Sequence, residues 1–210
     1  MKDLDLIEIL QDHLKKTCPF DQTLTICSTQ EGVRKVRESI REQSNFMEKQ
    51  LIQNVQTLDS YLINIIHEDR KIYHPSDFIK DFYNEENKLT NDTKQKFHAA
   101  MDVIRTARIT LGDGTNNIVK YYDSLSNKNF TVAFRFLIYV FETYTKYKKD
   151  NSKVDLEDIK YKILDPRITL PYNIVLMINE AQNYNPLEWM VINKLISMSQ
   201  YVYMTGNHSL

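Results

Sequence analysis

The sequence has few of the residues that form disulfides or tight turns: two Cys, four Gly and five Pro among 210 residues. Cys18 and Cys27 are too few for a disulfide framework, and neither stands in a zinc-ligand spacing, so we expect a reducing, intracellular setting. Scarce Gly and Pro favour helices and few tight turns. The sequence also lacks Gly-x-x-x-x-Gly-Lys-Ser/Thr, the loop whose amides and lysine hold nucleotide phosphates.

Long apolar runs and an excess of one charge are absent as well. No apolar run approaches the ~20 residues of a membrane span, so we expect no membrane partner. The net charge is -1, which leaves only a local patch to attract nucleic acid. The acidic, amphipathic start is not typical of a signal peptide. These features indicate a cytoplasmic protein, and its many Lys, Asn, Ile and Tyr residues suggest an AT-rich source such as a phage or virus.

A short apolar run near the end of the chain organises the fold prediction. Residues 174–178 are all apolar, rich in Ile and without a helical period, and the polar residues Asn179, Glu180, Gln182 and Asn183 follow. That pattern is typical of a strand buried on both faces of a parallel sheet. Ligands of such sheets bind outside the carboxyl ends of the strands. We therefore predict an α/β fold, helix-rich with a small parallel sheet, and a candidate site at Asn179 and Glu180.

Other segments alternate between short strands and helices. Strands are predicted over 23–28, 55–57 and 201–207, each followed by polar residues or a turn. Helices are predicted over 3–16, from residue 30 with an apolar stripe reaching residue 51, after residue 57, and over 186–196 with Pro at the first turn. The helix after residue 57 would be capped by Asp59 or Ser60.

The middle of the chain, from about 75 to 149, has a helical pattern. Its main break is 111–115, Leu-Gly-Asp-Gly-Thr, which lacks the Lys and Ser/Thr of a phosphate loop, so a plain turn is favoured. The aromatic residues between 130 and 147 could stack nucleic-acid bases. Their spacing fits a buried helix stripe better. Asp155 and Asp158 fit the first turn of a further helix.

Taken in order, these segments resemble the UvrD/Rep-like superfamily-one DNA helicases. Residues 179–183, Asn-Glu-Ala-Gln-Asn, stand where that family has the Asp-Glu-x-Gln-Asp of motif II. Residues 27–30 resemble motif Ia, residues 55–61 motif Ib, residues 155–159 the acidic element before motif II, and Gly206-Asn207 the end of motif III. The resemblance spans nearly the whole chain.

The resemblance implies a P-loop NTPase-like (RecA-like) motor domain with a large all-helical insertion. The implied boundaries are 1–70 and 166–210 for the motor domain and 71–165 for the insertion. The residues that remain from the family's catalytic site would be Glu180, in vestigial form, and Gln182. The residues that would contact a nucleotide are Asn179, Glu180, Gln182 and Asn207. Those that would contact single-stranded nucleic acid are Ser28, Thr29, Gln30, Arg34 and Thr57.

Several departures from that family bear on catalysis. Asn occupies both motif II carboxylate positions and the motif III position, and an amide is a poorer ligand than a carboxylate for magnesium. By this resemblance, we expect the chain to begin just beyond the P-loop and to lack the second motor domain. No resident metal or cofactor is therefore expected, and ATP and magnesium would bind only if another chain supplied the P-loop.

Three functions stay open. The first is a non-catalytic binding or scaffolding component with a protein partner in a nucleic-acid-processing complex. The second is one half of a split ATP-dependent DNA helicase. The third is a single-stranded nucleic-acid-binding module, although Arg34 lies among glutamates and would equally form ion pairs within its helix. An unrelated α/β domain is the alternative to all three.

Overall fold

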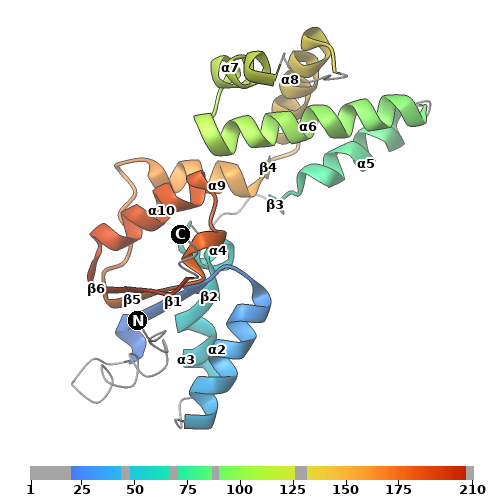
Figure 1. The fold of residues 1–210 in the computed structure, drawn as a ribbon. Helices are drawn as coiled ribbons and strands as arrows, with labels where there is room; N and C mark the ends of the chain where they lie inside the picture. The colour runs from blue at the N-terminus through green and yellow to red at the C-terminus, as the bar shows by residue number, and fades with distance from the viewer. Residues whose placement is uncertain (1–19, 44–47, 67–70, 87–89, 126–131, 207–210) are drawn as a thin grey trace. The chain divides into compact units, whose positions relative to one another are not determined.

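The computed structural model describes residues 20–43, 48–66, 71–86, 90–125 and 132–206 (Figure 1). The chain divides into two compact units: Met1–His67 with Ile163–Leu210, and Glu68–Lys162. Each unit is described by itself. The helix expected over 3–16 lies outside the described residues. In the part of the chain that is described, no helix is both long enough and apolar enough to cross a bilayer.

The first unit is built on a four-stranded parallel sheet. Its strands are β1 (Thr23–Cys27), β2 (Val55–Thr57), β5 (Asn173–Asn179) and β6 (Ser199–Met204), in the order β2-β1-β5-β6. Strand β5 pairs in parallel on both sides, with Leu176 opposite Leu24 of β1 and Val202 of β6. The predicted parallel sheet and helix-rich α/β class are thus confirmed.

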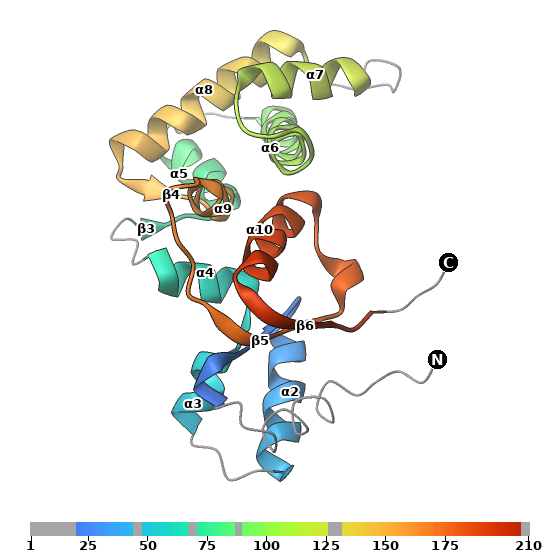
Figure 2. The same ribbon diagram turned by 90° about the vertical axis from the view of Figure 1, so that its left-hand side faces the viewer.

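Helices cover both faces of this sheet, as the two ribbon views show (Figures 1 and 2). On one face lie α2 (Gln30–Gln43) and α3 (Glu48–Asn54), and on the other α4 (Leu58–Ile66) and α10 (Pro186–Ser197). The apolar stripe expected in one helix is divided between α2 and α3. Its buried residues pack on the sheet in a cluster of Val33, Ile40, Leu51, Val175 and Met177. Coverage on both faces explains why β5 is apolar without alternation.

Helix α10 begins as its sequence predicts. Pro186 stands in the first turn, and Asn185 precedes it as the cap. The Asn185 side chain accepts from the Glu188 amide at 3.0 Å, and the Glu188 carboxylate accepts from the Asn185 amide at 3.0 Å. This reciprocal capping box satisfies two amide donors that a helix start otherwise leaves open.

The second unit is mainly helical. It contains α5 (Pro75–Glu86), α6 (Asn91–Leu111), α7 (Thr115–Leu125) and α8 (Phe134–Asp150), a two-residue strand pair of β3 (Lys71–Ile72) and β4 (Lys153–Val154), and most of α9 (Leu156–Leu164). The expected turn between α6 and α7 is present, with Gly112 and Gly114 at φ of 109° and 107°. Only glycine adopts such angles readily.

Aromatic side chains fill the core of this unit. Tyr144 is 1% exposed and its ring lies 5.0 Å from that of Phe78, while Phe97 meets Phe136 edge-on at 4.9 Å. The predicted aromatic stripe is therefore largely a packing stripe. Phe134 and Tyr139 at the start of α8 are exposed, at 39% and 50%.

The same unit contains a buried network of charged side chains at the start of α9. Asp155 is fully buried and accepts from Arg108 Nη1 at 2.8 Å, Lys148 Nζ at 2.7 Å and the Tyr144 hydroxyl at 2.8 Å. Its other oxygen accepts from the Asp158 amide at 2.8 Å, which caps the helix. Asp155 and Asp158 thus form the helix start that the sequence predicts. They also neutralise two buried cations, which the sequence did not indicate.

Candidate functional site

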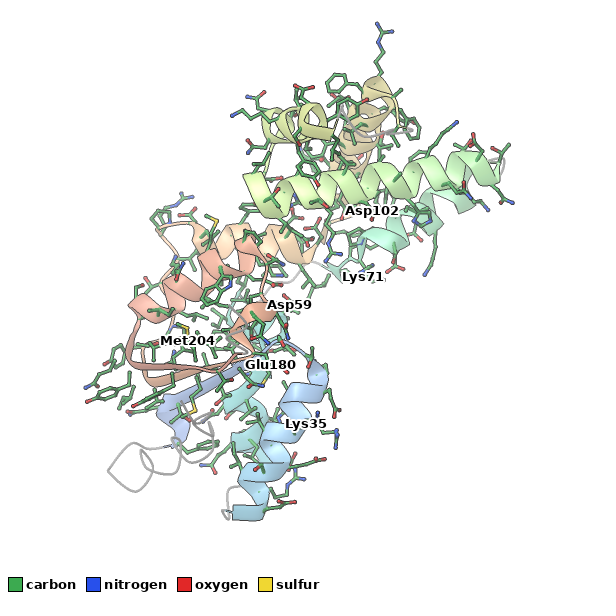
Figure 3. All side chains as sticks on the ribbon, viewed as in Figure 1. Lys35, Asp59, Lys71, Asp102, Glu180 and Met204 are labelled. Atoms are coloured by element: carbon green, nitrogen blue, oxygen red, sulfur yellow. The ribbon has the colours of Figure 1, made fainter. Side chains whose placement is uncertain are left out.

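Polar residues follow three neighbouring strands at one edge of the sheet. Ser28 comes directly after β1, Glu180 after β5 and Thr205 after β6. Because the strands are parallel, their carboxyl ends share this edge. Figure 3 labels Glu180 here, beyond the end of its strand. Residues far apart in the sequence are thereby brought within hydrogen-bonding distance.

The Glu180 carboxylate is bound by the loop that follows β1. Ser28 Oγ donates to Glu180 Oε2 at 2.8 Å, and Asn183 Nδ2 donates to Ser28 Oγ at 3.3 Å and more weakly to Glu180 Oε2 at 3.5 Å. Asn183 lies in the 3-10 turn η2 (Ala181–Asn183). The carboxylate therefore lies beside the loop entering α2, where a helix dipole favours negative charge.

Glu180 also has a strained backbone. Its φ of 55° and ψ of 52° place it in the left-handed region, which residues other than Gly, Asn and Asp seldom adopt. Such conformations cost on the order of 1–3 kcal/mol and persist only where surrounding contacts hold them. The contacts here are the hydrogen bonds on both sides of Glu180: its side chain to Ser28 and its amide to Thr205 Oγ1 at 3.3 Å.

Thr205 joins β6 to the end of β5. Its hydroxyl donates to Asn179 Oδ1 at 2.8 Å, its amide donates to the Ile178 carbonyl at 2.9 Å, and its carbonyl accepts from the Ala181 amide at 2.7 Å. The Asn179 amide oxygen is thus occupied by a neutral hydroxyl donor. Thr205 was not among the residues expected at this edge, although its position directly after the last strand was a usable signal.

The Gln182 side chain lies beside Gly206. A Cβ added to Gly206 would come 2.5 Å from Gln182 Oε1, so the glycine leaves room for that side chain. Gln182 is exposed. Asn207, the remaining residue expected on the nucleotide side, lies outside the described residues.

The residues expected to meet nucleic acid at the start of α2 are engaged locally. Thr29 caps the helix, since its Oγ1 accepts from the Gly32 amide at 3.0 Å, and Gln30 is the exposed first residue of α2. Arg34 donates to Glu31 at 2.6 Å and to Glu38 at 2.8 Å along the same helix face. Arg34 therefore has the intrahelical ion pairs that the sequence offered as the alternative.

Thr57 has a local partner as well. Its hydroxyl donates to Ser60 Oγ at 2.9 Å and accepts from the Ser60 amide at 3.3 Å. Thr57 is thus the cap of α4, and the prediction that Asp59 or Ser60 would cap this helix is wrong. Of the candidate residues, the structure joins Ser28, Asn179 and Glu180 in one network, to which Thr57 and Arg34 are not hydrogen-bonded.

Neither nucleophilic nor metal chemistry is favoured by the groups at this edge. Burial, with a smaller effect of Glu180, raises the pKa of the Cys27 thiol to about 12, so the thiol stays protonated. Among the described residues, no group of three or more His, Cys, Asp and Glu side chains is placed to hold a metal ion. The hydrogen-bonded network around Glu180 otherwise contains amides and hydroxyls, a weak donor set for magnesium.

Neither the scan against protein-family models nor the search of curated proteins gives a match.

Proposed function

We propose that the chain is a degenerate UvrD-like motor domain that acts as a non-catalytic binding or scaffolding component of a nucleic-acid-processing complex. The observation that carries this proposal is the closed network at the carboxyl edge of the sheet. Ser28 and Asn183 bind the Glu180 carboxylate, and Thr205 binds the Asn179 amide oxygen. The groups that would serve nucleotide chemistry in the family are used here to hold the loops together.

The fold gives this lineage its support. A parallel sheet with helices on both faces, and a helical unit placed in sequence between α4 and β5, follow the order in which the family resemblance places motifs Ia and Ib, an insertion, and motifs II and III. The order of elements agrees with the family's order of motifs over the described chain, whereas each single motif is short. The proposed relationship to the family is therefore based on the order of elements.

The proposal excludes catalysis on chemical grounds. Phosphoryl transfer depends on positioned phosphates and on a divalent cation that neutralises developing charge. This sequence has neither a P-loop lysine nor its amide cradle. Asn179 offers a neutral oxygen where a hard cation prefers a carboxylate, and that oxygen already accepts from Thr205 at 2.8 Å.

A protein partner is favoured over single-stranded nucleic acid by the state of the candidate contact residues. Arg34 is paired with two glutamates, and Thr29 and Thr57 each cap a helix. Releasing any of them to a phosphate would break an existing interaction. With a net charge of -1, the chain offers little electrostatic compensation.

The direct test is nucleotide binding and hydrolysis by the purified full chain, with and without single-stranded DNA. We expect no hydrolysis above background, no effect of Glu180→Gln on that background, and no salt-dependent oligonucleotide binding in fluorescence anisotropy. Purification of the tagged chain from its native cells after nuclease treatment should recover a nucleic-acid-processing protein. ATP hydrolysis that Glu180→Gln abolishes would refute the proposal. Hydrolysis appearing only after a P-loop chain is added would favour the split-helicase alternative.

A further inference from the structure

We draw no further inference here: the strongest candidate, strand β6 at one edge of the described sheet with the side chains of Tyr201 and Met204 exposed at 45% and 47%, carries none because nothing in the structure shows what covers that edge.

Discussion

Replacing Asp155 by asparagine tests the buried ion network of the second unit. The carboxylate accepts from Arg108, Lys148 and Tyr144 on one oxygen and from the Asp158 amide on the other. A side-chain amide at this position would keep the shape but remove the charge and turn donors toward donors. Breaking a buried ion pair typically costs about 3–5 kcal/mol. Asp158 still contacts both cations, each at 2.6 Å, so we expect the lower end, about 3 kcal/mol.

The loss should depend on pH in a defined direction. Burial alone would raise the pKa of Asp155, but Arg108 and Lys148 outweigh it and hold the pKa well below its usual range. A carboxyl group with a depressed folded-state pKa stabilises the fold above its unfolded pKa of about 3.9, and that contribution is lost as pH falls. The difference between wild type and Asp155→Asn should therefore be full at pH 7 and shrink from about pH 4 downward.

Thermal and urea unfolding followed by circular dichroism measure this difference. For a unit of this size, about 3 kcal/mol lowers the melting temperature by more than about 10 °C. Asp92→Asn is the matched control, because Asp92 forms an exposed i,i+4 pair with Lys96 and should change stability by less than about 0.5 kcal/mol. An Asp155→Asn protein as stable as the control at pH 7 would refute the reasoning.

Three further predictions concern the first unit. Ser28→Ala removes the hydroxyl donor of the Glu180 carboxylate and should lower the free energy of unfolding by about 1.5 kcal/mol in urea titrations; no change would mean that the contact is not formed in solution. Asn185→Ala removes the cap of α10 and should cost about 1 kcal/mol by the same measurement, with Asn185→Asp as the conservative control. In a Cys18→Ser background, Cys27 should react with a thiol reagent at pH 8 only after denaturation, and rapid native labelling would contradict its burial.

The parts of the fold that could be predicted were those with a local cause. Residues 174–178 are continuously apolar because β5 is covered on both faces, and that signal sufficed to place a central parallel strand. Pro186 marked the first turn of α10 because its missing amide proton costs nothing there. The turn at residues 112–114 was likewise readable from its two glycines.

Other elements have causes that lie elsewhere in the chain. Strands β3 and β4 are two residues each, and each exists only because the other pairs with it across more than 80 residues. Helix α7 lies within the region that the sequence predicted to be helical, but it buries Ile118 alone among its residues, so its own bounds had no clear apolar stripe to mark them. The division of the expected stripe into α2 and α3 has no marking glycine or proline in the sequence.

The candidate site was also only partly predictable from the sequence. Ser28 was expected to contact nucleic acid and Glu180 to lie on the nucleotide side, whereas the structure joins the two side chains across 152 positions of sequence. Strand order could not predict that Glu180 adopts a left-handed backbone, because no neighbour in sequence requires it. That conformation is held by the contacts to Ser28 and Thr205, so the carboxylate and the strain support each other. A ligand that needs the Glu180 carboxylate must first break the Ser28 contact, and this cost opposes the binding of a nucleotide at this edge.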